Sequence, residues 1–134
     1  MSRNPPPDPP FVVEPADPRS TDASDLVRRL TAELAERYDF LYDGSGNFTP
    51  DDVLVPGAAF LIGRAAGHAV ACAAFRPLEP GVAEVKRVYV APEHRGRGYG
   101  RLLIAALEHE AGAFGYARLR LETGDRQPES IALY

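Results

Sequence analysis

The chain of 134 residues is poor in several residue types, and each shortage excludes a class of protein. Cys72 is its only cysteine, so no disulfide can form within the chain and nothing indicates an oxidising compartment. No segment approaches the roughly 20 apolar residues of a membrane-spanning helix, and Met1 to Pro10 lack the apolar stretch of a signal peptide. These absences predict a cytoplasmic protein that does not enter a membrane.

Positive charge is also in short supply, with 15 Lys and Arg against 19 Asp and Glu, which leaves a net charge of -4. Binding to nucleic acid or to anionic lipid favours a basic surface, so small molecules are the expected partners. The histidines and the cysteine are not spaced as metal ligands, and no metal is expected.

The composition of the remainder is that of a globular domain, with 45% hydrophobic and 25% charged residues. Residues 1–10 contain five prolines and almost no apolar side chains, so they can bury little to offset the entropy of ordering. We expect residues 1–10 to be a disordered tail and residues 11–134 to form one domain.

Apolar periodicity predicts the elements of the first half of this domain. Phe11 to Val13 favour a short strand. Leu26, Leu30, Leu34 and Tyr38 recur at helical spacing behind Ser24 and Asp25, residue types that cap helices. Turn-forming residues over 43–50 predict a loop.

The second half continues with a predicted hairpin of strands 59–64 and 68–75, closed by Pro77, Pro80 and Gly81. A strand over 82–90, a helix over 99–114, a strand over 118–123 and the start of a helix over 128–134 follow. This order predicts an α+β fold with a mixed, mostly antiparallel central sheet flanked by helices.

The residues with the clearest chemistry follow the strand that ends at Val90. After Val90 the chain enters a turn rich in arginine and glycine, and the predicted helix over 99–114 begins directly after this turn. Several backbone N–H groups at the start of that helix therefore have no partner within it. The glycines leave room for a phosphate, and the arginines and the helix dipole add positive potential. These residues are Arg95, Gly96, Arg97, Gly98, Gly100 and Arg101.

Glycines at this spacing also occur in dinucleotide-binding and nucleoside-triphosphate-binding loops. Here the turn follows an antiparallel meander rather than the first strand of a parallel unit, and Gly100 is not followed by Lys and Ser or Thr. Both alternatives are therefore disfavoured. A third alternative is a tight turn in which the glycines serve only geometry.

The segment resembles the pyrophosphate loop of the GNAT acetyltransferases, whose pattern is Gln or Arg, two residues, Gly, one residue, then Gly or Ala. Arg95 to Gly100 match this pattern, AEVKRVYVAPEHRGRGYG resembles the strand and loop around it, and LLIAALEHEA resembles the following helix. Before Phe60 the resemblance is one of element order.

The resemblance implies that the protein binds acetyl-CoA as a cosubstrate and transfers its acetyl group directly to a primary amine of a small molecule or protein. Backbone groups of Val88 and Val90 would pair with the pantetheine arm, and the amides from Arg95 to Arg101 would hold the pyrophosphate. The implied cofactor-binding residues are Val88, Tyr89, Val90, Arg95, Gly96, Arg97, Gly98, Tyr99, Gly100, Arg101 and Gln127, the last standing where the family often has asparagine.

Two residues are candidates for proton transfer, because the amine must lose a proton and the departing thiolate must gain one. Glu84 lies on the motif strand, where many family members place a base, but a salt-bridged carboxylate is an equally good interpretation. Tyr134 ends an Ala-Leu-Tyr triplet that resembles the family's helix with a general-acid tyrosine. His68 and His109 have no adjacent acid or nucleophile in the sequence and are expected to be structural. His94 in the loop is expected to be a phosphate neighbour or a solvated side chain rather than a base, and Cys72 a small core residue.

A GNAT domain usually continues beyond this tyrosine with two further strands, so by resemblance the domain is expected to be C-terminally incomplete or completed by a second copy in a homodimer. The alternative function is a non-catalytic or degenerate module that binds acyl-CoA. The acceptor amine is not specified by the sequence.

Overall fold

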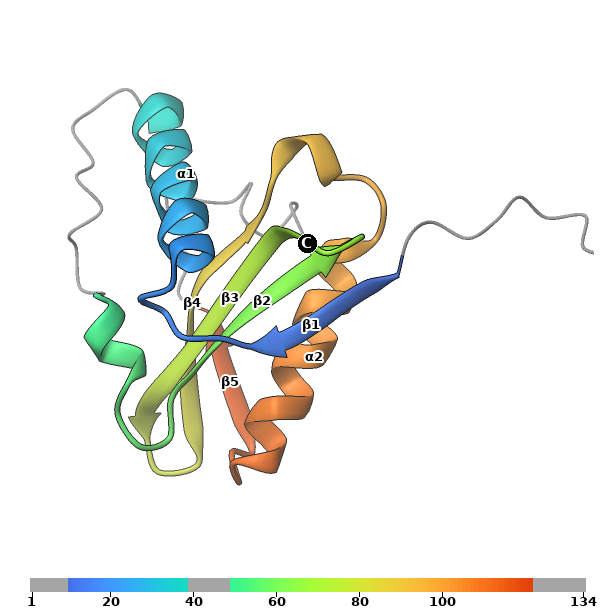
Figure 1. Ribbon diagram of the computed structural model, residues 1–134. Helices are drawn as coiled ribbons and strands as arrows, with labels where there is room; N and C mark the ends of the chain where they lie inside the picture. Colours follow the sequence, from blue (N-terminus) through green and yellow to red (C-terminus); the bar gives the residue numbers. More distant parts are fainter. Residues whose placement is uncertain (1–9, 39–48, 122–134) are drawn as a thin grey trace, which may run out of the picture.

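The computed structural model describes residues 10–38 and 49–121, and a five-stranded sheet forms their centre (Figure 1). The strands are β1 (Phe11–Pro15), β2 (Ala59–Ala65), β3 (His68–Glu79), β4 (Val82–Val90) and β5 (Arg118–Leu121). They lie in the order β1-β2-β3-β4-β5, and every neighbouring pair is antiparallel except β4 and β5, which run parallel. The expected α+β fold with a mixed, mostly antiparallel sheet is confirmed.

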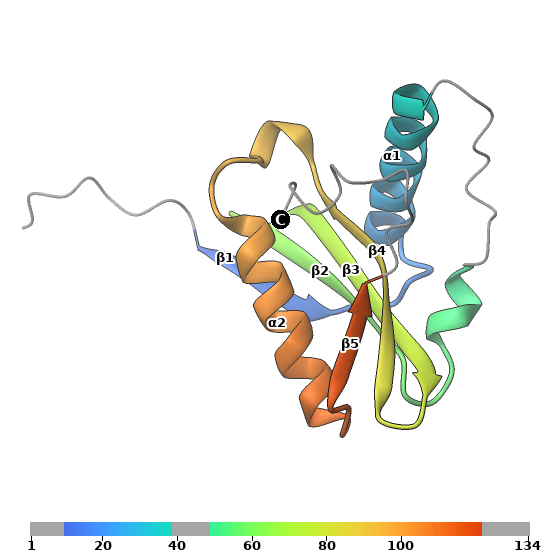
Figure 2. The same ribbon diagram turned by 180° about the vertical axis from the view of Figure 1, so that it is seen from behind.

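One helix packs on each face of the sheet. α2 (Tyr99–Ala113) packs Leu103 and Leu107 onto the face that carries Phe75 and Val85, and Figure 2 shows this helix in front of the sheet. The opposite face is covered by α1 (Thr21–Tyr38) and the 3-10 turn η1 (Pro50–Val53). Side chains of successive strand residues alternate between the faces, so both sides of the sheet become core. None of the described helices is long and apolar enough to cross a membrane.

α1 begins earlier than the sequence indicated. Ser24 and Asp25 were the expected capping residues, but the helix starts at Thr21, and the hydroxyl of Ser20 accepts a hydrogen bond from the N–H of Ala23 at 3.2 Å. Ser20 is thus the cap, since its oxygen satisfies a free amide of the first turn. The apolar repeat that began at Leu26 marks only the buried face, and the preceding turn is mostly polar.

β3 is longer than expected. Pro77 was placed in the closing turn, yet the strand continues to Glu79 and Pro77 pairs with Ala83 beside an irregularity in the register. A register irregularity tolerates proline because a ladder hydrogen bond is already interrupted there. β5 is described to Leu121, and the predicted helix over 128–134 and most of the loop over 43–50 lie outside the described residues.

β4 is irregular just after the segment that pairs with β5 in the described part of the chain. Its pairing with β5 runs from Val82 to Val85, and its register with β3 shifts between the Cys72 and Ala74 pairs. Arg87 lies at this shift with φ of 58°, a left-handed conformation that is unfavourable for a side-chain-bearing residue. The irregularity bends β4 just beyond Val85, the last residue that pairs with β5 in the part of the chain that the structure describes.

Gly63 leaves room for an aromatic contact that connects β1 to the start of α2. The rings of Phe11 and Tyr99 are stacked, with centroids 4.4 Å apart and planes 6° apart. A Cβ atom on Gly63 would lie 2.8 Å from Cε1 of Phe11 and closer still to Cζ. A larger residue at position 63 would therefore push Phe11 out of its stack.

We predict that Gly63→Ala destabilises the fold by about 1–3 kcal/mol, the usual cost of overpacking a core. Urea denaturation followed by circular dichroism measures this change. In the double variant with Phe11→Ala the clash is absent, so the two changes should cost clearly less than the sum of the single variants. Additive costs would show that Gly63 does not act through Phe11.

Candidate functional site

A short loop joins the end of β4 to α2, and its shape depends on two glycines. After Val90 the chain passes through the 3-10 turn η2 (Pro92–His94) and reaches Gly96 with φ of 80° and Gly98 with φ of 82°. These left-handed values favour glycine. An added Cβ would meet nothing within 4 Å at either position, so backbone conformation and not space requires glycine there.

The first turn of α2 has free amides. Gly98 occupies the N-cap position and makes no side-chain capping hydrogen bond, and the first turn contains no acidic residue. The leading N–H groups of a helix carry a partial positive charge, and without a cap they are available to an anion. The structure therefore has the strand, turn and uncapped helix from which the sequence predicted an anion site.

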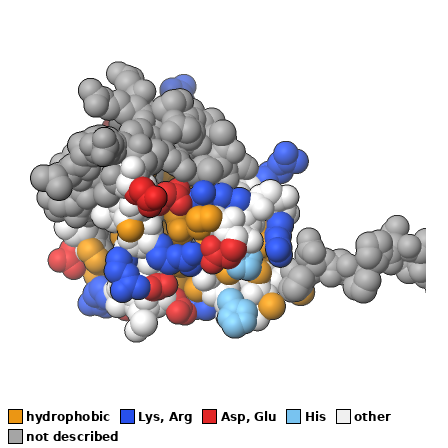
Figure 3. Space-filling view, turned by 90° about the horizontal axis from the view of Figure 1, so that it is seen from above, with side chains coloured by type: hydrophobic (Ala, Val, Ile, Leu, Met, Phe, Trp, Pro, Cys, Tyr) orange, Lys and Arg blue, Asp and Glu red, His pale blue; other side chains and the backbone are white. Residues whose placement is uncertain are grey.

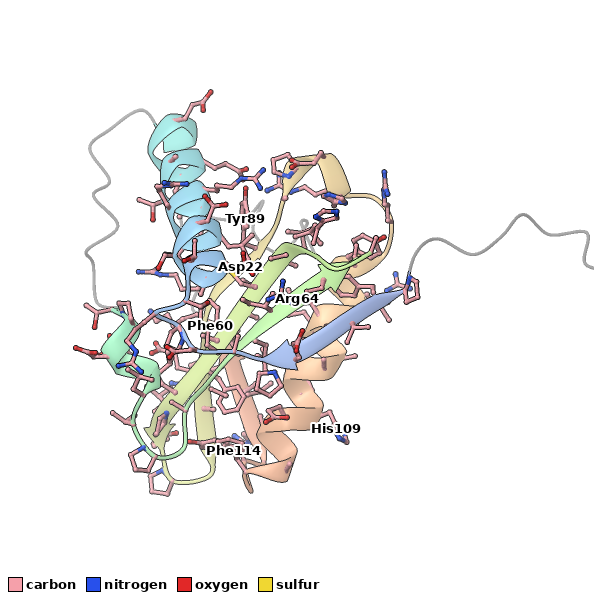
Figure 4. The ribbon with its side chains drawn as sticks, viewed as in Figure 1. Asp22, Phe60, Arg64, Tyr89, His109 and Phe114 are labelled. Atoms are coloured by element: carbon pink, nitrogen blue, oxygen red, sulfur yellow. The ribbon has the colours of Figure 1, made fainter. Side chains whose placement is uncertain are left out.

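Arg95, the first residue of the motif, is turned toward the protein. Its Nε donates to the carbonyl oxygen of Val90 at 2.8 Å, and its Nη2 donates to both carboxylate oxygens of Glu33 in α1 at 3.0 Å. The guanidinium also lies over the ring of Tyr89, 5.7 Å from its centroid, on the sheet face next to α1 (Figure 4). We expected Arg95 to add positive potential to the loop, but its charge is compensated by Glu33.

The arginines that remain outward are Arg97 and Arg101, both exposed beside the loop. Figure 3 shows the end of the molecule that carries this loop, where basic and acidic side chains are interspersed. Two buried polar atoms nearby, Nδ1 of His94 and the hydroxyl of Tyr99, have no hydrogen-bond partner within the described part of the chain. Such atoms are uncommon in folded proteins and are groups that a bound molecule could satisfy.

The backbone of β4 that is expected to pair with the pantetheine arm makes some of its hydrogen bonds within the protein. Ala91 N–H donates to Val70 of β3 at 2.8 Å, so by alternation the N–H and C=O of Val90 face the other way, toward the side of β5. Within residues 49–121, β5 pairs with β4 only as far as Val85, which leaves the later part of this edge without a neighbouring strand. The carbonyl of Val90, however, accepts the hydrogen bond from Arg95.

Glu84 lies near the other end of β4 in a chain of charges. It is 6% exposed, and its Oε1 accepts a hydrogen bond from Nε of Arg76 at 2.9 Å while Oε2 lies 3.6 Å from Nζ of Lys86. Arg76 reaches Asp52 as well, at 3.2 Å. The salt-bridged interpretation of Glu84 is therefore what the structure shows, because a carboxylate this buried needs a compensating charge.

A groove of about 320 Å³ opens beside this carboxylate. Charged and apolar side chains both line it, and the lining residues are Asp52, Val55, Arg76, Pro77, Leu78 and Glu84. The sequence analysis missed Arg76 and Asp52. Arg76 pairs directly with Glu84 in the hairpin register, so a correctly aligned hairpin would have revealed it, whereas Asp52 comes from η1 through tertiary packing.

The remaining candidates lie elsewhere. Cys72 is fully buried, burial raises the pKa of its thiol to about 12, and its Sγ–H donates to the carbonyl of Arg87, as expected of a core residue rather than a nucleophile. His68 and His109 are exposed, the latter on α2 (Figure 4). Gln127 and Tyr134 lie outside the described residues, so their roles stay predictions. Residues 10–38 and 49–121 hold no group of three or more His, Cys, Asp or Glu placed for a metal ion.

Comparison with known proteins decides the family, because residues 23–134 match the acetyltransferase (GNAT) family. The chain belongs to the GNAT family. It is 39% identical over 119 residues to an IAA acetyltransferase from Azospirillum brasilense, an alignment that covers 87% of this chain and 78% of that protein. The named relatives support an acyltransferase.

Solved structures agree with this assignment. A candidate acyl-CoA N-acyltransferase from Klebsiella pneumoniae superposes with a TM-score of 0.72 and 34% identity, covering 92% of this chain and 79% of that one. A GNAT acetyltransferase from Elizabethkingia anophelis, solved with acetyl-CoA bound, shares the fold with a TM-score of 0.64 at 17% identity, over 92% of this chain and 72% of that one.

We predict that Gly98→Glu lowers the affinity for CoA by about tenfold or more, because a carboxylate would then stand at the amides that await the phosphates. Isothermal titration calorimetry measures the affinity. Gly67→Glu is the matched control, since Gly67 also has a positive φ, of 84°, and open space around it but lies in the turn between β2 and β3. Equal affinities for the two variants would contradict the assigned phosphate site.

Proposed function

We propose that this protein is an N-acetyltransferase that moves the acetyl group of acetyl-CoA directly to a primary amine of a small molecule or protein. The observation that carries the proposal is the uncapped, glycine-shaped start of α2 at the end of β4, in a chain that belongs to the GNAT family. The chain spans most of the length of the two relatives reported above that are more than 30% identical to it, which supports a shared activity.

In this proposal backbone groups of the loop and of β4 bind the cofactor. The amides from Gly96 to Arg101 receive the pyrophosphate, with Arg97 and Arg101 supplying charge from the exposed side. The pantetheine arm lies along the part of β4 that β5 leaves unpaired in the described residues. Of the expected ligands in this region, Arg95 contributes neither its side chain nor its amide directly, because the side chain is bound to Glu33 and Val90 and the N–H donates to the carbonyl of Pro92.

The acceptor binds in the groove beside Glu84. Glu84 precedes Val90 by six residues, about 20 Å along an extended strand, so an arm reaching from the loop along β4 brings its thioester toward the groove. The apolar side chains of the groove suit the body of an organic amine, and its carboxylates suit a cationic nitrogen before deprotonation.

The reaction needs two proton transfers. The amine nitrogen attacks the thioester carbonyl, a C–N bond forms and the C–S bond breaks; the nitrogen loses its proton to Glu84, directly or through water, and the thiolate takes a proton from Tyr134. The bond from Arg76 keeps the Glu84 carboxylate oriented. Both roles follow from the family resemblance and the position of Glu84 on β4.

The alternative function is a module that binds acyl-CoA without transferring the acyl group. The salt-bridged state of Glu84 is the observation that favours it, because both carboxylate oxygens are already engaged, one by Arg76 and the other by Lys86. The Azospirillum relative is named an IAA acetyltransferase, which makes IAA worth including in an acceptor screen alongside amines.

We predict that Glu84→Gln lowers kcat/KM by about a hundredfold while the affinity for CoA stays unchanged, as the loss of a general base does. Release of free CoA thiol from acetyl-CoA measures the rate with an acceptor found by screening. Glu14→Gln is the control, because it removes a strand carboxylate that is also paired with an arginine, Arg64, but does not line the groove. Equal losses in the two variants would assign Glu84 a structural role.

We further predict that Tyr134→Phe slows turnover by about a hundredfold with CoA affinity intact, since only the proton donor is removed. The same thiol-release assay, run from pH 6 to 9, is the measurement. Turnover equal to that of the unmodified chain would remove Tyr134 from the mechanism and leave protonation of the sulfur to water or another donor.

A further inference from the structure

Two ion pairs connect α1 to the loop that precedes α2, and in both of them the side chains bind each other rather than the proposed cofactor. Nη2 of Arg29 donates to the carboxylate of Glu93 at 3.1 and 3.0 Å, and Nη2 of Arg95 donates to the carboxylate of Glu33 at 3.0 Å to each oxygen. Both pairs join residues more than 60 positions apart in the sequence. We name these four residues the α1–loop clamp.

The clamp has a complementary order of charges. Arg29 and Glu33 are one helical turn apart, so they lie on the same side of α1. On the loop the signs are reversed, with Glu93 and Arg95 two residues apart. A shift of the loop by two residues would place Arg95 opposite Arg29 or Glu93 opposite Glu33, so the two pairs set the position of the loop against the helix as well as its distance from it.

The second pair is the stronger of the two by its surroundings. The side chains of Arg95 and Glu33 are 21% and 19% exposed, against 36% and 57% for Arg29 and Glu93. Ion pairs shielded from water are screened less by salt. In the exposed pair, hydrogen bonds from its own backbone N–H and from Arg29 lower the pKa of Glu93, so this carboxylate stays ionised at neutral pH.

The clamp acts on the segment that the proposed function assigns to the pyrophosphate. Arg95 is followed by Gly96, Arg97 and Gly98, all exposed, so this part of the loop has no buried side chain that could pack it. A loop of this kind loses conformational entropy on closing around an anion unless another part of the protein holds it. Arg95, tied to Glu33 and to the carbonyl of Val90, provides that restraint.

We propose that Glu33 and Arg29 are positioning residues for acyl-CoA: from α1, through Arg95 and Glu93, they hold the loop before α2 in the shape that receives the pyrophosphate. The proposal rests on the proposed function of the loop. It also predicts that α1, which packs on the sheet face opposite α2, contributes to cofactor affinity without touching the cofactor.

Charge substitutions separate positioning from simple attraction, because the two predict opposite signs. Glu33→Gln removes a negative charge near the loop, and Glu93→Arg replaces a negative charge by a positive one. Electrostatic attraction alone would therefore tighten the binding of the anion CoA in both variants. Positioning requires the reverse. We expect Glu33→Gln to weaken CoA binding by about fivefold and Glu93→Arg by about threefold, the range that ion pairs of partial exposure contribute.

Two further variants complete the test by calorimetry with CoA as the probe. The charge swap Arg29→Glu with Glu93→Arg rebuilds the exposed pair with reversed signs, and we expect it to restore affinity to within about twofold of the unmodified protein. Glu36→Gln is the matched control, because it removes the same charge as Glu33→Gln from an exposed position of the same helix, and we expect no loss.

Melting temperatures identify a merely structural role. All affinities are measured below the melting transition of the least stable variant. A lower melting temperature with CoA affinity equal to that of Glu36→Gln, or tighter binding by Glu33→Gln and Glu93→Arg, would overturn the proposal. If the unmodified protein binds no CoA, the proposed function fails and the clamp loses its purpose with it; if it binds and the variants do not differ, only the clamp proposal fails.

Discussion

The hydrogen bonds of one guanidinium group, that of Arg95, hold together the parts of the molecule on which the site depends. One nitrogen binds the last carbonyl of β4, another binds a carboxylate of α1, and the cation lies over the ring of Tyr89. Arginine suits this position because its planar fork makes directed bonds to several acceptors and remains charged when half-buried. The residue that begins the family motif therefore acts here first as a structural connector.

This use of Arg95 changes which groups can bind the phosphates in the proposed function. Its charge is compensated by Glu33, so the proposed anion binding relies on backbone amides, the dipole of α2 and the exposed Arg97 and Arg101. Amides are fixed in direction by the backbone, and they can bind an anion well only if the loop keeps its shape. The contacts that hold the loop in shape therefore also determine how well its amides can bind an anion.

β4 arranges the two halves of the proposed reaction in a line. The loop follows its last residue, and the charged groove lies beside Glu84 near its first. Between them the strand is irregular at Arg87, where the register with β3 shifts, and among residues 49–121 its pairing with β5 reaches only Val85. An irregular strand with an unpaired edge offers backbone groups to a ligand, which a regular, fully paired central strand does not.

The sequence by itself determined the order of strands and helices, the mixed sheet and the loop before α2, because these follow from local apolar periodicity and from the spacing of Gly96, Gly98 and Gly100. It misplaced the start of α1, since a polar first turn has no apolar repeat, and it ended β3 at Phe75, before Pro77, because a register irregularity cannot be seen in one strand. Only the tertiary structure decided what the charged residues do. Glu84 meets Arg76 across a hairpin and Asp52 through packing, and Arg95 meets Glu33 from a helix 62 positions earlier. A charged side chain takes its role from the partner that folding brings within about 3 Å, and that partner is set by the packing of distant elements.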